Sequence, residues 1–477
     1  MSKSVFCLFL GMAIAQAGCT LTPKYTRPDA PVPAEWPSGA AYPDTRTVTN
    51  APQAPELMWQ EFFADEKLRK LIETALRNNR DLRLAALNVE WARAMYGIRR
   101  AELLPAVSAV GSGSKQRVPA DLSPAGERQT MEQYGVDLGI FSWELDFFGR
   151  IRSLKDRALE EYLATEQAHR GAEILLVSAV ANAYLVLAAD REGLSLSQTT
   201  LATQQDVYNL IKRRYDLGLA PELDLYRVQT QVDIARGDIA RFTQLVAQDE
   251  NALNLLLGAA APGELLPAKL SGVTPPRGIS PGISSEVLLL RPDVLLAENL
   301  LRAAHADIGT ARATFFPHIS LTAAVGTASS ELSGLFESGS GTWSYAPQIA
   351  MPIFDTRTWS ALKVTKVQRE MAVTQYEKAI QNAFKEVADA LAIRGTVDLQ
   401  VSAQESLLNA VAETYRLSNT RYDKGIDSYL GVLDAQRSLY AAQQGLVSLR
   451  LAKLANRVRL YAVLGGGGNQ PSIPATP

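Results

Sequence analysis

The 477-residue chain contains only two cysteines, Cys7 and Cys19. Cys7 lies in an apolar run, 5–15, which follows Lys3 and is too short to span a bilayer. Such a run is typical of a signal peptide, which we expect to cover residues 1–18 and to be removed on export. One remaining cysteine cannot form an internal bridge, so a disulfide-stapled framework is excluded.

Two processing routes remain open for this leader. Gly18-Cys19 resembles a lipobox, in which Cys19 becomes the lipidated first residue and anchors the chain to a membrane. Ala15-Gln16-Ala17 also fits a small-x-small site that is cleaved without lipid attachment. Lipidation of Cys19 is the favoured prediction.

Histidines and clustered charge are also scarce. The three histidines, His169, His305 and His318, lie on separate expected elements without metal-ligand spacing. Forty-eight basic residues nearly balance 50 acidic ones, and no basic patch indicates nucleic acid. The sequence "LGGGGN" near the C-terminus lacks the Lys-Ser/Thr of a phosphate loop. We therefore expect no enzyme, no metal site and no cofactor.

Proline and glycine mark the boundaries of the expected domains. Prolines recur through the arm 19–62, which we expect to be extended and to lie on a surface. A second stretch rich in both residues, 259–284, is expected to link two halves, and 466–477 is expected to be a flexible tail.

The two halves, 63–258 and 285–465, are predicted to be tandem repeats. Each is expected to contain a helix, two strands, a long helix, a turn and a second long helix. Arg-Tyr-Asp-x-Gly occurs at the turn of both halves, at 214–218 and 421–425. Residues with matching identity and spacing are Asp81, Gly97, Arg100 and Pro105 in the first half and Asp293, Gly309, Arg312 and Pro317 in the second.

The helical patterns are unusually long. A proline-free pattern from about Arg150 to Tyr215 would extend on the order of 100 Å at 1.5 Å per residue. After the turn, apolar or small residues recur at alternating spacings of three and four from Leu225 to Leu256, as in a coiled-coil seam, with Asp249 as the one polar exception. Such helices favour antiparallel hairpins, with Gly218 and Gly425 in the left-handed position that ends a helix.

Four segments alternate between apolar and polar residues, at about 104–117, 132–147, 316–330 and 341–354. Their length suits tilted membrane strands, although ordinary hairpins packed on helices give the same pattern. No 18-residue apolar helix is expected after the leader, which favours membrane strands. Four strands cannot close a barrel and lipid tolerates no open edge, so two or three chains would share one barrel.

Four motifs stand out by their order and spacing: "WELDFFGRIRS" (143–153), "SSEVLLLRPDVLLAE" (284–298), "ARATFFPHISLTA" (311–323) and "YLGVLDAQRSLY" (429–440). In these motifs the chain resembles the TolC-like outer-membrane channels of tripartite efflux pumps, and within them the OprM-type lipoprotein branch. It implies a mixed α and β membrane protein that forms a homotrimer. A twelve-strand outer-membrane β-barrel, four strands per chain, would stand on a long periplasmic coiled-coil α-helical barrel, and 19–62 would join an equatorial belt.

The same resemblance implies passive conduction of small molecules for an inner-membrane transporter of the resistance-nodulation-division type, coupled through a periplasmic adaptor. It places a periplasmic gate at Asp434 and Leu430, and it implies a bond between Tyr422 and Asp224. The turns at the end of the tube have nothing of their own chain to cover them, so we expect them to dock the adaptor. The docking residues are Gly218, Leu219, Ala220, Gly425 and Ile426.

Two other functions remain open. An outer-membrane exit duct for proteins or metal ions would share the same fold. A periplasmic coiled-coil scaffold would belong to a different class, and it would be released with the periplasm, whereas a channel would need detergent.

Overall fold

The computed structural model describes residues 20–42, 57–124, 126–280 and 284–467. The predicted leader 1–18, Cys19 and most of the tail lie outside these ranges. The chain divides into two compact units. The first contains 1–29, 88–165 and 296–376, and the second contains 30–87, 166–295 and 377–477.

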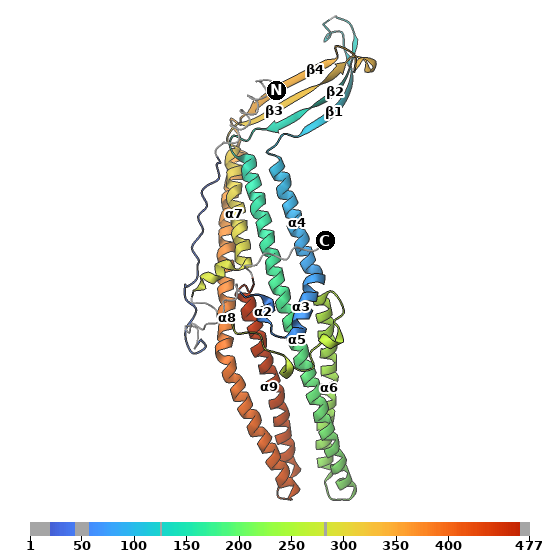
Figure 1. Ribbon diagram of the computed structural model, residues 1–477, viewed down its shortest axis with the longest axis vertical. Helices are drawn as coiled ribbons and strands as arrows, with labels where there is room; N and C mark the ends of the chain where they lie inside the picture. The colour runs from blue at the N-terminus through green and yellow to red at the C-terminus, as the bar shows by residue number, and fades with distance from the viewer. Residues whose placement is uncertain (1–19, 43–56, 125, 281–283, 468–477) are drawn as a thin grey trace. The chain divides into compact units, whose positions relative to one another are not determined.

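Each half of the chain contains a helix, two strands and two long helices in the same order (Figure 1). Two short helices, α2 (Trp59–Phe62) and α3 (Glu66–Asn78), precede the first set. Then follow α4 (Arg80–Ala101), β1 (Val107–Val118), β2 (Gln129–Glu144), α5 (Arg150–Asp216) and α6 (Glu222–Leu257). After three short 3-10 turns come α7 (Pro292–Ala313), β3 (His318–Ser329), β4 (Gly341–Ala350), α8 (Thr356–Asp423) and α9 (Tyr429–Val463).

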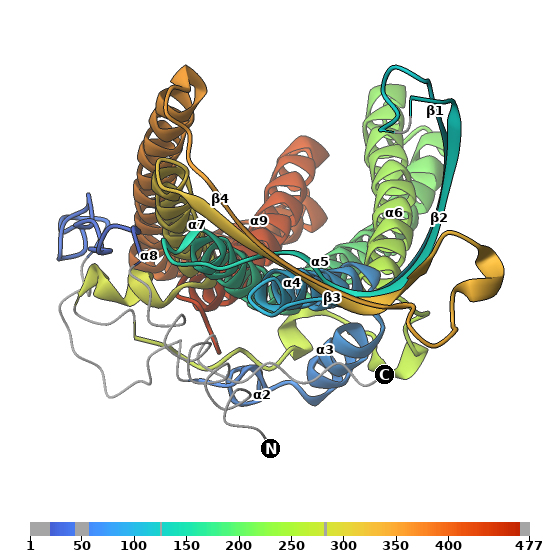
Figure 2. The ribbon, with the colours of Figure 1, turned by 90° about the horizontal axis from the view of Figure 1, so that it is seen from above.

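The first unit contains one antiparallel sheet in the order β1-β2-β3-β4. Its strands lie close to the predicted ranges, but β4 ends at Ala350 rather than near 354. Ser142, with a φ of 60°, lies in a bulge that interrupts the pairing of β2 with β3 between Ile140 and Trp143. Bulges bend strands, and the sheet is visibly curved (Figure 2).

Both edges of this sheet are open within the described part of the chain, because β1 and β4 each pair with one strand only. Every residue of β4 is exposed, including Trp343 at 81% and Ile349 at 69%. A strand with large apolar residues exposed along its length is not packed on a helix of its own chain. The described part of the chain therefore leaves this strand uncovered.

The arm before Asp29 is fastened to α7 by a buried carboxylate. Glu298 has a side chain only 3% exposed and accepts hydrogen bonds from Arg27 and Arg302, each 2.7 Å from a carboxylate oxygen. Burial opposes its ionisation, but these two guanidinium groups prevail and lower the pKa of Glu298. The ring of His305 lies 3.0 Å from the Pro23 carbonyl oxygen, so the arm is held along the helix.

The second unit has a core built on aromatic stacking. The ring of Phe62 on α2 stacks on that of Tyr461 on α9, with centroids 4.2 Å apart. The Tyr461 hydroxyl donates to the Leu57 carbonyl at 3.0 Å. Asn79 closes the end of α6 by donating from its side-chain amide to the Leu256 carbonyl at 2.9 Å. The segment 57–79 is thereby held against α6 and α9.

The expectation that no long apolar helix follows the leader is wrong. One window of 18 residues within α5 is long and apolar enough to cross a membrane by length and composition. More than half of that window is buried inside the chain, including Val180, Tyr184 and Leu187. Such burial is typical of a core helix. The alanines between the large residues allow neighbouring helices to approach closely.

The seam of α6 follows the predicted spacing over most of its length. Val228, Val232, Phe242 and Leu253 are buried, and at the end Leu257 is buried more deeply than the predicted Leu256. Asp249, the polar exception, lies beside Asp190 of α5. Burial, followed by this neighbouring carboxyl, raises the pKa of Asp249 to about 7.

A raised carboxyl pKa predicts a stability that falls as pH rises. The folded chain binds the Asp249 proton more tightly than the unfolded chain does, so the penalty is absent below about pH 4 and complete above pH 7. We expect Asp249→Asn to raise the apparent melting temperature in detergent at pH 8, with a gain that shrinks towards pH 4.

Asp233→Asn on the same helix is the matched control, since Asp233 is exposed and pairs with Arg236. An equal gain for Asp249→Asn at pH 5 and pH 8 would show that the carboxyl is ionised at both.

Candidate functional site

The candidate site is built at the two turns that reverse the long helices. Gly218 and Gly425 both have a φ of 71°, as the sequence predicted for the residue that ends a helix. The amides of Leu219 and Gly218 bond to the carbonyls of Arg214 and Tyr215, at 2.7 and 2.8 Å. The second turn repeats this pattern of a Schellman motif, with Ile426 and Gly425 as donors.

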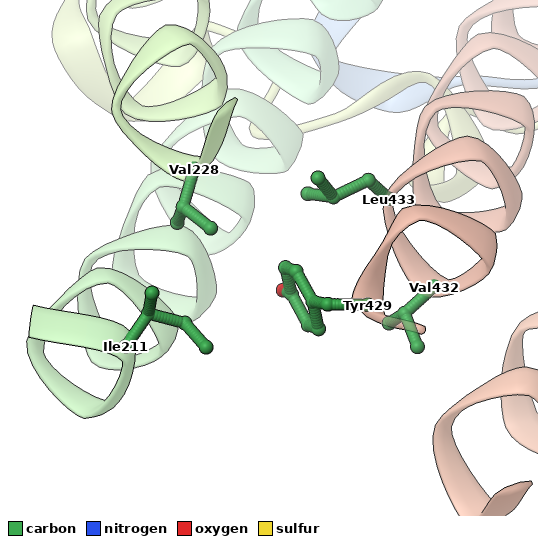
Figure 3. Close-up of a cluster of buried hydrophobic side chains, with 5 residues drawn as sticks. All are labelled: Ile211, Val228, Tyr429, Val432 and Leu433. Atoms are coloured by element: carbon green, nitrogen blue, oxygen red, sulfur yellow. The ribbon is translucent and has the colours of Figure 1, made fainter. Parts of the chain in front are cut away.

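A cluster of buried side chains joins the two hairpins just above the turns (Figure 3). Ile211 of α5 and Val228 of α6 face Tyr429, Val432 and Leu433 of α9. All five are at most 4% exposed. The Tyr429 hydroxyl has no hydrogen-bond partner among the described residues, and burial raises its pKa. This apolar cluster, which we call the tip cluster, is the last packed layer before the turns.

One charged hydrogen bond crosses between the hairpins beside the tip cluster. Arg214 donates from Nη1 to the Tyr422 hydroxyl at 2.9 Å, and its guanidinium carbon lies 5.5 Å from the centre of that ring. The ring of Tyr422 packs edge-to-face on Tyr429, with centroids 5.0 Å apart. Tyr422 is therefore fixed by its ring and by its hydroxyl together.

Asp224, the predicted partner of Tyr422, makes a different contact within the chain. It pairs with Arg227 one turn further along α6, at 3.5 Å. The chain thus brings Tyr422 to Arg214 and does not bring it to Asp224. A bond from Asp224 to Tyr422 of a neighbouring copy would be a contact between two chains.

The two turns are alike in backbone but not in charge. Arg421, the counterpart of Arg214, pairs with Asp427 inside its own turn, and Asp427 occupies the position of Ala220 in the first half. Tyr215, the counterpart of Tyr422, is 39% exposed. The cross-link therefore forms in one direction only, from the first hairpin to the second.

The predicted gate residues do not belong to the tip cluster and lie on an exposed side of α9. Leu430 is 42% exposed, and the Asp434 side chain is 65% exposed. They are one turn apart, so their side chains lie on one face. Among the described residues, the one ion pair of Asp434 is a long contact with Arg437 at 3.9 Å, so these residues compensate little of its charge.

The predicted docking residues are at the surface of the turns. Leu219 is 66% exposed and Ile426 58% exposed. No atom lies within 4 Å of a Cβ built on either Gly218 or Gly425. Ala220 is half-buried. Both turns therefore present short or apolar groups to whatever approaches the hairpin ends.

The arrangement offers contact and charge rather than reaction chemistry. Within the described residues no group of three or more His, Cys, Asp or Glu side chains could hold a metal ion. The sequence interpretation missed Arg214 and the tip cluster. Arg214 is part of the repeated Arg-Tyr-Asp turn, and the buried side chains follow the seam spacing, so both signals were present.

Comparison with known proteins agrees with this architecture. The family model "Outer membrane efflux protein" matches 71–259 and again 283–466. The chain is 47% identical over 468 residues to "Toluene efflux pump outer membrane protein TtgC" of Pseudomonas putida, covering 98% of this chain and 96% of the other. It is 40% identical over 462 residues to "Outer membrane protein OprJ" of Pseudomonas aeruginosa, covering 96% and 95%.

A solved structure has the same fold over nearly the whole length. The open state of the Neisseria gonorrhoeae MtrE outer membrane channel is 37% identical, with a TM-score of 0.84 over 94% of this chain and 98% of the other. With its two family matches, its open sheet and its paired hairpins, the chain belongs to the outer membrane efflux protein family.

Proposed function

We propose that this protein is the outer-membrane channel subunit of a tripartite efflux pump. It conducts drugs or other small molecules passively, from a periplasmic adaptor and an inner-membrane resistance-nodulation-division transporter to the outside. The single observation that carries the proposal is the match of the family model to both halves of the chain. A relative named for toluene efflux is consistent with it. The exposed strand β4 and the absence of reaction chemistry at the turns support it.

The proposed assembly is a homotrimer. Three chains would supply twelve strands, the open edge of β4 in one copy pairing with β1 of the next. A second surface supports this arrangement, since Trp91, Met95 and Ile98 form an exposed apolar stripe on α4. The spacing of three and four places them on one helix face, as expected of a face covered by another copy.

We expect the detergent-solubilised protein to have the mass of three chains by native mass spectrometry, and the same preparation to conduct ions in planar bilayers. Asp434→Ala should leave that mass unchanged, because the residue is exposed on α9 and belongs to no strand. A monodisperse monomer that conducts would contradict the shared barrel.

Tandem duplication is part of the proposal and explains the order of elements. Each half supplies two strands and a helical hairpin, with boundaries near 63–258 and 285–465. The lipid anchor remains a prediction, because Cys19 lies outside the described residues. Mass spectrometry of the mature N-terminal peptide separates a diacylated Cys19 from an unmodified Gly18 terminus.

The gate is proposed to lie at the turns. Three copies of Leu430 would form an apolar collar, and three copies of Asp434 would hold like charges close to one axis, where a cation relieves their repulsion. The bond from Arg214 to Tyr422 supports a closed state, because it ties the two hairpins of each chain together. A hydrogen bond to a charged group contributes about 1.5–3 kcal/mol.

Tyr422→Phe combined with Asp434→Ala is expected to raise single-channel conductance and to sensitise cells to vancomycin. Asp434→Ala alone should weaken block by divalent cations added from the periplasmic side, because the anionic ring is lost. Tyr215→Phe is the matched control, since this repeat-equivalent tyrosine does not make the cross-link. A double variant that folds normally and conducts like the wild type would place the constriction elsewhere.

Docking of the adaptor is proposed to use the turns themselves. Their small or apolar residues have no cover from the chain, and short side chains allow a partner helix to approach closely. Leu219→Trp adds bulk at this surface without requiring a left-handed backbone, so it should lower drug resistance severalfold while trimer yield is unchanged. Leu219→Ala keeps the surface small and should retain resistance. Equal resistance and equal adaptor cross-linking in both variants would argue against docking here.

A further inference from the structure

A cavity of about 270 Å³ lies in the second unit, away from the turns. Its walls come from three segments: the stretch 277–279 after α6, the middle of α8 at 391–398, and the last turns of α9 at 453–460. Tyr42 closes one side. Neither the gate nor the docking surface uses these residues, so the cavity is independent of the proposed function.

The charged groups in the wall are strongly unbalanced. Four are cationic and one is anionic: Arg277, Arg394, Lys453, Arg457 and Asp398. Asp398 pairs with Lys453, with Nζ and Oδ1 2.6 Å apart. Arg277 has no ion pair among the described residues. Three positive charges therefore converge on the cavity without a counter-charge in its wall.

Two of the arginines are oriented by the backbone and not by carboxylates. Arg394 donates from Nη1 to the Ile279 carbonyl at 3.1 Å, and Arg457 donates from Nη1 to the Pro276 carbonyl at 3.2 Å. A carbonyl oxygen fixes a guanidinium group without neutralising its charge. Each guanidinium has five N–H groups, so most of its donors stay available for an anion.

The remaining wall is partly apolar, with Asn456 and Tyr42 as its polar members. Ile279, Leu391 and Leu460 are between 3% and 5% exposed, so their positions are fixed by packing. A concave site with an apolar wall and a few converging charged groups is the usual form of a small-molecule site. The volume accommodates a compact molecule larger than a free inorganic anion.

We propose that this cavity binds a small organic anion, whose carboxylate or phosphate contacts the arginines and whose apolar body packs on Ile279 and Leu460. Arginine favours these two anions because its planar fork matches their oxygen geometry. The bound anion would tie the stretch after α6 to α8 and α9, since each of the three contributes at least one cation.

The test uses the full chain in a non-ionic detergent, with phenyl phosphate and benzoate as probes in isothermal titration calorimetry. Each probe should bind once per chain, and binding should weaken with added salt because the attraction is ionic. Inorganic phosphate alone should bind more weakly, because it lacks the apolar body. Benzyl alcohol should not bind. A stronger response to phenyl phosphate than to benzoate would assign a phosphate ligand, and the reverse a carboxylate.

Variants separate a built site from general attraction to a basic surface. Arg277→Gln should weaken phenyl phosphate binding roughly tenfold, the loss of one charge-assisted hydrogen bond. Asp398→Asn should tighten it, because Lys453 loses its partner and is freed. Arg450→Gln is the control. Arg450 is on α9, as Lys453 is, but it pairs with Glu405 and does not line the cavity.

Absence of saturable binding by either aromatic anion would overturn the proposal. Equal affinity in the Arg277→Gln, Asp398→Asn and Arg450→Gln proteins would overturn it as well, because the binding would then lie elsewhere. Channel conductance and trimer mass do not enter these measurements, so failure of the efflux proposal would leave the result on the cavity standing.

Discussion

The need to pair backbone N–H and C=O groups at the edges of the sheet constrains the rest of the molecule. A sheet of four strands leaves two edges, and a hydrocarbon environment supplies no partner for either. Exposed apolar residues along β4 add a second reason for association. Until these surfaces are covered, the free chain presents a template for incorrect pairing. In the proposed homotrimer, the yield of assembled protein should therefore depend steeply on chain concentration.

The two turns have the same backbone conformation but make different contacts between the hairpins. Their backbones are nearly superimposable in conformation, with glycine φ values of 71° in both. Among several differences, Asp427 in place of Ala220 engages Arg421 within its own turn, while Arg214 reaches the other hairpin. The order of elements is symmetric, while the interaction between the hairpins is not. Further along the hairpins a second tie adds to this bond, since the Tyr440 hydroxyl of α9 donates to Asp238 of α6 at 2.9 Å.

The long periodic segments could be predicted closely from the sequence, because seam spacing and turn glycines are local signals. The 3-4 pattern of α6 and the positive φ of Gly218 and Gly425 are examples. Contacts that depend on distant pairing could not be predicted in the same way. The resemblance paired Tyr422 with Asp224, but Arg214 is the residue that lies within reach inside the chain. The sequence interpretation also overlooked the apolar window of 18 residues in α5. Its buried alanines and aromatics do not follow a regular spacing.

The fastening of the N-terminal arm has a consequence for its reach. Thr22 contacts Ser153 through their hydroxyls at 3.1 Å, and Arg27 and Glu298 hold the arm again a few residues later. If Cys19 is the lipidated first residue, as predicted, residues 19–22 alone would precede the contact at Thr22. A fully extended residue spans at most about 3.6 Å, so this tether covers roughly 11 Å. A lipid on Cys19 would therefore limit how far Ser153 can lie from the membrane surface.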